Sequence, residues 1–228
     1  MARIEKIFLK ILIALCFGSL AIFGLIAPFY KKAEKPEIFV VKPAGQQATY
    51  QLKTSTPVIA NVGDTLSVEI WLDTDADSDA AEALVSFDPT KLEPVDASGN
   101  AITSETLVNQ AIQQGNLYSL YLYPAMYMDP VELAVKGLRL ADGKIDIVAG
   151  LPANSTPYNS NGTPGLFAKI NFKAKVNSGS TTISLITAAA PQGGVNSSVG
   201  LKGGPADILN QSLLVDDGNL VINFGVQP

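Results

Sequence analysis

Four aspartates at alternate positions form the cluster in this sequence that is best suited to binding an ion: Asp73, Asp75, Asp77 and Asp79. Carboxylate oxygens are ligands that Ca²⁺ prefers. The spacing begins like an EF-hand loop, but Ser78 stands where that loop needs glycine and Leu84 where it needs a bidentate acid. A looser calcium site completed by Glu82 is one interpretation, and an acidic, solvated turn without metal is the other.

The sequence lacks the residues of most hydrolytic mechanisms. It has no histidine, and its single cysteine, Cys16, lies in an apolar stretch near the N-terminus. These absences exclude Ser-His-Asp and Cys-His catalysis, an intrachain disulfide and the usual zinc sites. Two carboxylates alone can hydrolyse a glycoside, but nothing in this sequence pairs two of its acids convincingly. We therefore predict that the protein is not an enzyme.

A second candidate surface is aromatic, and it consists of Tyr118, Tyr121, Tyr123 and Tyr127. Exposed rings provide a platform for a sugar ring or a protein hot spot. On a strand, Tyr121 and Tyr123 would share a face. Packing against neighbouring elements explains the same cluster, so both interpretations stay open. Trp71, in contrast, is expected in the core, because it lies near the inward phase of an alternating strand.

A β-rich domain must position these residues. From residue 47 onward, short β-branched runs alternate with clusters of Gly, Pro, Asn and Asp, which is typical of an antiparallel sandwich and predicts an all-β fold. A short helix is predicted from the cap residue Ser104 to Gly115, and a second from Asp129-Pro130 toward Leu140. The predicted strands are residues 47–53, 66–72, 80–87, 117–123, 144–150, 167–173, 181–186 and 220–224.

Five blocks of sequence occur in the order and roles of a cohesin module: residues 62–68, 86–93, 143–148, 165–173 and 181–185. The sequence thus resembles a cohesin-type domain over residues 47–225. The resemblance implies a jelly-roll β-sandwich of about nine strands, related in fold to carbohydrate-binding modules. It also implies a non-catalytic module that docks a calcium-loaded dockerin on a flat sheet face. Residues 97–142, with the two predicted helices, are longer than the corresponding connection of the family.

The resemblance also implies which residues would meet a partner. Ala83, Val85 and Phe87 fill inward positions of the family's central strand. Glu82, Leu84 and Ser86 point outward, and Glu82 stands where many cohesins have an acidic contact residue. A solvated surface acid is the alternative interpretation of Glu82.

An uncharged stretch at residues 11–30 follows Arg3, Lys6 and Lys10. It is long enough to cross about 30 Å of hydrocarbon and exceeds the roughly 7–15 apolar residues of a cleavable signal. We predict a membrane anchor at residues 1–30, a stalk at 31–46 and the sandwich at 47–228, with a cleaved signal as the alternative. Basic residues flank both ends, so the positive-inside rule does not set the orientation. The polar, cysteine-free remainder favours a single-pass protein with a cytoplasmic N-terminus and the sandwich at the cell surface.

Charge argues against nucleic acid as a partner. Beyond residue 30, 13 Lys and Arg stand against 20 Asp and Glu, a net of −7, and the basic residues are scattered. The predicted partners are the membrane, through residues 11–30, and a dockerin-like protein. A surface polysaccharide bound by the tyrosines, or copies of the chain in a surface assembly, are the alternatives. No cofactor is predicted apart from the calcium considered for the aspartates.

Overall fold

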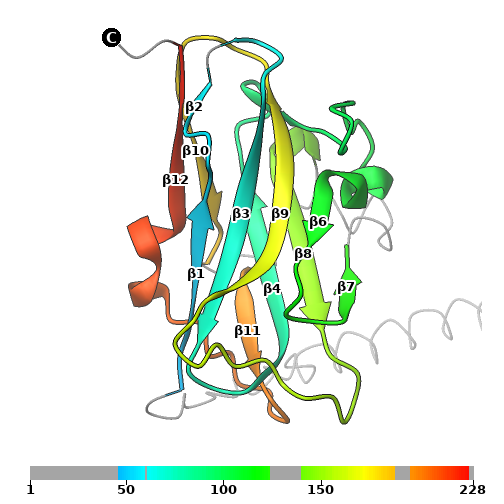
Figure 1. Ribbon diagram of the computed structural model, residues 1–228, viewed down its shortest axis with the longest axis vertical. Helices are drawn as coiled ribbons and strands as arrows, with labels where there is room; N and C mark the ends of the chain where they lie inside the picture. The colour runs from blue at the N-terminus through cyan, green and yellow to red at the C-terminus, as the bar shows by residue number, and fades with distance from the viewer. Residues whose placement is uncertain (1–45, 60, 124–139, 188–195, 226–228) are drawn as a thin grey trace, which may run out of the picture. The chain divides into compact units, whose positions relative to one another are not determined.

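The computed structural model describes residues 46–59, 61–123, 140–187 and 196–225 (Figure 1). The chain divides into two units, Met1–Val40 and Val41–Pro228, and the described residues all belong to the second. The predicted membrane anchor and nearly all of the predicted stalk lie outside the described residues. Within the described ranges, no helix has the length and apolar character needed to span a membrane.

Two β-sheets pack face to face, and β3 and β9 cross in front of β4 in Figure 1. The first, here the β3/β9 sheet, has the order β1 (Ala48–Lys53), β3 (Thr65–Thr74), β9 (Gly165–Ala174), β5 (Leu92–Pro94), with β6 (Ile112–Gln114) also paired to β9. The second, here the β4/β8 sheet, has the order β2 (Val58–Ile59), β12 (Asn219–Phe224), β10 (Gly179–Leu185), β4 (Ser78–Ser86), β8 (Lys144–Gly150), β7 (Leu120–Leu122), with β11 (Ser198–Leu201) paired to β4. The strand pairs are antiparallel except β2 with β12.

Alternation of apolar and polar side chains places the core between the sheets. In β3, Leu66, Val68, Ile70 and Leu72 are at most 3% exposed, and each is flanked by a more exposed residue. Burial of one such side chain contributes about 1.5–3 kcal/mol. At the centre, the rings of Tyr50 and Phe167 meet edge to face with centroids 5.8 Å apart. This core makes the sandwich a rigid support for its two outer faces.

The predicted all-β sandwich is confirmed, and each of the eight predicted strands overlaps an observed one. The first predicted helix is wrong in type and extent. Residues Glu105–Ala111 form a 3-10 helix, and the next three residues form β6, because Ile112–Gln114 pair with the edge of β9. Ser104 makes no side-chain cap hydrogen bond. Of the second predicted helix, the described part is the single 3-10 turn Leu140–Asp142, and the rest lies outside the described residues.

Two further short 3-10 segments lie before β12 in the described chain. These are Gln211–Leu213 and Val215–Gly218. The chain turns into β3 at Gly63-Asp64, where Gly63 has a φ of 92° and its N–H donates to the carbonyl of Ala174. It turns again at Asp88-Pro89, where the Asp88 carboxylate accepts the N–H of Thr90 at 2.9 Å.

Candidate functional site

The outward face of β4, β8 and β7 is partly apolar. Across the strands, Gly200, Ala80, Gly150 and Leu120 form one row, and Ser198, Glu82, Val148 and Leu122 form the next. Leu120 and Leu122 are 52% and 51% exposed. Glycine and alanine beside them leave the backbone close to the surface. An exposed apolar patch bordered by small and polar residues is typical of a protein–protein interface.

The structure places the three predicted contact residues of β4 on this side, but not all of them are accessible. Glu82 and Ser86 are half-buried, whereas Leu84 is only 2% exposed. Its partner in register, Asp146 of β8, is 5% exposed. The prediction that Leu84 is an outward contact is therefore wrong, because alternation sets the direction of a side chain but not whether it is covered. The open part of the face lies toward β7.

Sequence reasoning missed Leu120 and Leu122. Both lie in the predicted strand 117–123, in opposite phase to Tyr121 and Tyr123. Two leucines in the phase opposite to buried rings were the available signal.

The tyrosines pack inward instead of forming an exposed platform. The Tyr121 hydroxyl donates to the carbonyl of Phe167 at 2.6 Å, and the ring centroids of these two residues are 5.8 Å apart. Tyr123 is 5% exposed, and its hydroxyl accepts a hydrogen bond from Gln114. Tyr118 is 4% exposed. Burial raises the pKa of Tyr118, Tyr121 and Tyr123. Of the two open interpretations, packing against neighbouring elements therefore holds for Tyr118, Tyr121 and Tyr123, and Tyr127 lies outside the described residues.

Each of the four aspartates accepts a hydrogen bond from a different residue, and the four donors come from three separate segments of the chain. Asp73 accepts from the Ser160 hydroxyl, Asp75 from the N–H of Gln47, Asp77 from the Asn159 amide at 3.3 Å and Asp79 from the N–H of Gly203 at 3.0 Å. In the described part of the chain, no three acidic, histidine or cysteine side chains are grouped so that they could hold a metal. The four hydrogen bonds tie the aspartate loop to neighbouring segments of the chain.

Trp71 lies on the outer face of the β3/β9 sheet, so its predicted place in the core is wrong. Its neighbours Ile70 and Leu72 are fully buried, while Trp71 is half-buried. Counting in twos from Ser67 and Glu69 gives this outward phase, and the prediction gave more weight to the apolar character of tryptophan than to its position. The indole N–H donates to Glu69 at 3.0 Å. This hydrogen bond, together with that from Lys169, lowers the pKa of Glu69.

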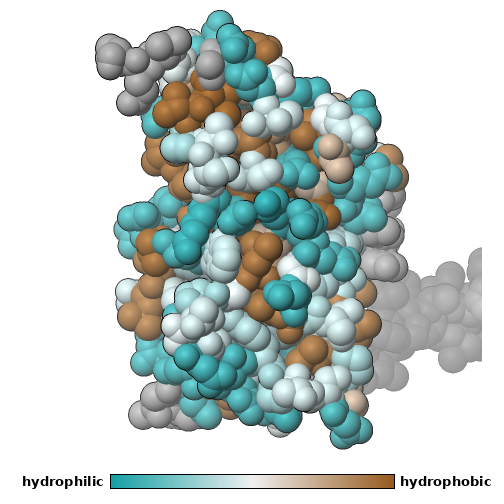
Figure 2. All heavy atoms as spheres, in the orientation of Figure 1, coloured by the Kyte–Doolittle hydropathy of each residue, from teal (hydrophilic) through white to brown (hydrophobic). Residues whose placement is uncertain are grey.

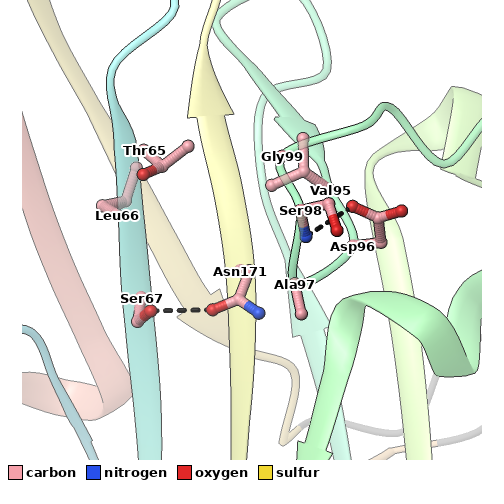
Figure 3. Close-up of a pocket in the computed structure, with 9 residues that line it drawn as sticks. All are labelled: Thr65, Leu66, Ser67, Val95, Asp96, Ala97, Ser98, Gly99 and Asn171. Carbon is pink, nitrogen blue, oxygen red and sulfur yellow. Dashed lines mark hydrogen bonds between the residues drawn. The ribbon is translucent and has the colours of Figure 1, made fainter.

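Hollows open on the described part of this outer face, and two of them are large enough to matter for binding. The first, of about 380 Å³, lies between β3, β9 and the loop at residues 95–99; there the Ser67 hydroxyl donates to Asn171 at 2.7 Å (Figure 3). The second, of about 450 Å³, lies beside Trp71. Figure 2, in the orientation of Figure 1, shows hydrophilic and intermediate side chains interrupted by separate hydrophobic spots. The two sheets therefore offer different surfaces.

The fold and the partly apolar outer face of β4, β8 and β7 define a β-sandwich module with a surface suited to binding. The sequence profile of the Cohesin domain matches residues 51–200, and the chain belongs to the cohesin family. Cohesins are non-catalytic modules that bind other proteins, which agrees with the prediction that this protein is not an enzyme. A comparison with curated proteins finds no match.

Solved structures show the same fold at low sequence identity. A type II cohesin domain from the cellulosome of Acetivibrio cellulolyticus is 16% identical with a TM-score of 0.52, and the match covers 78% of this chain and 95% of that one. A type II cohesin–X-dockerin complex from the same organism is 14% identical with a TM-score of 0.53, and the match covers 74% of this chain and 95% of that one. The third cohesin ScaC of the same organism, in complex with the ScaB dockerin, is 15% identical with a TM-score of 0.50. The match covers 79% of this chain and 100% of that one.

Proposed function

We propose that the protein is a membrane-tethered cohesin that captures a dockerin-bearing protein on the outer face of β4, β8 and β7. The observation that carries the proposal is the pair Leu120 and Leu122, each about half exposed beside a row of glycine and alanine. Membership of the cohesin family supports a protein partner, and two of the similar solved structures are complexes of a cohesin with a dockerin.

The geometry fits a protein partner for a physical reason. A stable interface buries about 800 Å² on each side, with its affinity concentrated in a few anchors at the centre. Leu120 and Leu122 supply apolar anchors, and the glycine and alanine row lets a partner helix approach the backbone closely. Glu82, in the same row as Leu122, supplies a polar contact on the same face.

The tether is proposed from residues 11–30, which carry no charge. With the N-terminus in the cytoplasm, this segment would hold the sandwich at the outer surface and keep the captured protein there. A polar stalk at residues 31–46 would separate the docking face from the membrane.

The test is a pull-down of dockerin-containing proteins from the same organism with the full chain in detergent. We expect the double variant Leu120→Asp, Leu122→Asp to weaken capture by about 100-fold, because two charges would be buried against an apolar partner surface. Leu213→Asp is the matched control, since Leu213 is 48% exposed and lies in a 3-10 segment away from β7. Capture unchanged in the double variant, or no capture of any dockerin by the wild type, would refute the proposal.

A further inference from the structure

We infer that the hollow beside Trp71 is a second binding site, on the sheet opposite the docking face, and that its ligand is a neutral sugar of a polysaccharide. This inference goes beyond the capture of a protein partner. Trp71 is the only tryptophan of the chain and stands on the outer face of β3. The residues that line the hollow are Trp71, Gln113, Gln114, Gly115, Asn116, Gly165 and Leu166.

Close packing requires glycine at two of the positions that line this hollow. A Cβ at Gly115 would lie 1.8 Å from the carbonyl oxygen of Leu166, and one at Gly165 would lie 2.3 Å from a methyl group of Leu117. The N–H of Gly115 donates to the carbonyl of Phe167 at 2.9 Å, which fixes the turn after β6 against β9. The register between β3 and β9 also shifts next to Trp71. Such irregularities are common beside functional sites, because they redirect side chains.

The indole ring is held in place before any ligand arrives. Its N–H donates to Glu69, which in turn forms an ion pair with Lys169 at 3.1 Å. The Lys53 ammonium lies 4.8 Å from the ring centroid. Lys53 belongs to β1, which pairs with β3 on the edge opposite to β9, and it is not among the residues that line the hollow. A ring fixed in this way loses little conformational entropy when a ligand stacks on it.

The lining selects an uncharged, hydroxyl-rich ligand. None of its seven residues carries a charge. The amides of Gln113 and Asn116 each offer one acceptor and two donors, which match neighbouring hydroxyl groups of a sugar. The C–H face of a pyranose ring is apolar and can cover the indole, while its hydroxyl edge meets the amides. An acidic sugar would find no cation among the lining residues.

A chain of sugars could extend from Trp71 along β3. Ser67, which lines the hollow of Figure 3, is four residues away on the same face, a distance of about 13 Å at about 3.3 Å per residue. Hydroxyl and amide groups of Ser67 and Asn171 lie at that end. The ligand is therefore expected to be an oligosaccharide or polysaccharide and not a single sugar.

The single tryptophan provides a direct readout. The full chain in detergent is titrated with three neutral polysaccharides (hydroxyethylcellulose, mannan and a soluble β-1,3-glucan) and with acidic polygalacturonate. We expect at least one neutral polymer to change the tryptophan fluorescence and to retard the protein in an affinity gel, with polygalacturonate doing neither. Absence of both effects for all three neutral polymers overturns the inference, and so does equal binding of polygalacturonate.

Variants locate the binding. Trp71→Ala is expected to reduce gel retardation by about tenfold or more, as for loss of a central anchor. Gln113→Ala with Asn116→Ala changes two residues of the rim, keeps the fluorescent reporter and should weaken binding to a similar extent. Leu120→Asp with Leu122→Asp, on the other sheet, should leave it unchanged. Gel retardation that persists in both hollow variants, or that is lost in the Leu120→Asp, Leu122→Asp variant, would overturn this site. Neither result would bear on the proposed capture of a dockerin, which the pull-down tests separately.

Discussion

Single carboxylates at residues 73–79 act as hydrogen-bond acceptors that connect distant segments. We expect the full chain to melt at the same temperature in excess EDTA and in millimolar calcium. Asp75→Ala should lower the free energy of unfolding by about 1 kcal/mol, because the N–H of Gln47 loses its acceptor, whereas Asp75→Asn keeps an acceptor oxygen and should cost less. Thermal melts of the three proteins in both buffers check this. A calcium-dependent rise in melting temperature that Asp75→Asn removes would contradict it.

The buried hydroxyl of Tyr121 predicts a pH dependence of stability. Desolvation is the main cause that raises the pKa of Tyr121 above its usual value of about 10. Folding then favours the neutral phenol. Its contribution is fully present below about pH 10, and it is lost as the pH rises from the unfolded pKa toward the folded one. Tyr121→Phe should cost about 1 kcal/mol near pH 7, by loss of the bond to Phe167.

This cost should shrink at about pH 11, since the variant has no phenol to ionise at residue 121. Tyr50 and Tyr118, whose pKa values are also raised, are present in both proteins and cancel in the comparison. Urea unfolding at the two pH values measures the difference. An equal cost at both would show that the Tyr121 hydroxyl is not desolvated in the folded state.

Among the elements, the turn between β6 and β7 depends on a glycine. Gly115→Ala would place a methyl group 1.8 Å from a backbone oxygen. We expect a loss of about 3 kcal/mol or more, because backbone and not a flexible side chain must move. Gly150→Ala is the control: its Cβ would lie 3.5 Å from the nearest atom, and its stability should stay within about 1 kcal/mol of wild type. Denaturant unfolding of both variants measures these changes in the free energy of unfolding. Similar losses in Gly115→Ala and Gly150→Ala would refute the packing argument.

Long strands were predictable from the sequence because they repeat the same alternation several times. β3 and β9 each have ten residues, enough for five buried positions or nearly so. β2, β5, β6 and β11 have two to four residues, too few to show a period, and they form because a longer neighbour offers an unpaired edge. The shortness of β6 also explains why the helix predicted for residues 104–115 was wrong: three residues show no strand period.

The candidate sites show a similar division. The resemblance to cohesins implied an outward direction for Leu84, but its burial depends on tertiary cover that no local pattern encodes. The aspartate spacing left a calcium site and an acidic turn without metal open, and the separate hydrogen-bond donor that the fold gives each carboxylate could not be read from that spacing. The outward positions of Trp71 and Leu120 could have been predicted from the alternation of their strands. For Trp71, the apolar character of the side chain led instead to the prediction of a core position.

At the scale of the whole molecule, the sandwich separates two outer faces by a core of fully buried residues such as Tyr50, Phe167 and Ile147. Substitutions on opposite faces share no contacts and should act independently. One module could then hold a protein on the β4/β8 sheet while the β3/β9 sheet contacts a polysaccharide. This arrangement would bring a captured protein close to a sugar polymer.

The last prediction concerns the tether of the full chain. We expect the protein in the membrane fraction, resistant to an alkaline carbonate wash, with the mass of a chain that keeps residues 1–30. Leu20→Lys with Phe23→Lys places two charges near the middle of the apolar stretch, where each costs about 2.5–3.5 kcal/mol of insertion free energy. This double variant should therefore move to the wash supernatant, whereas Glu37→Lys in the stalk should not. Wild-type protein in the supernatant would refute the tether, and a mature chain lacking residues 1–27 would show a cleaved signal in its place.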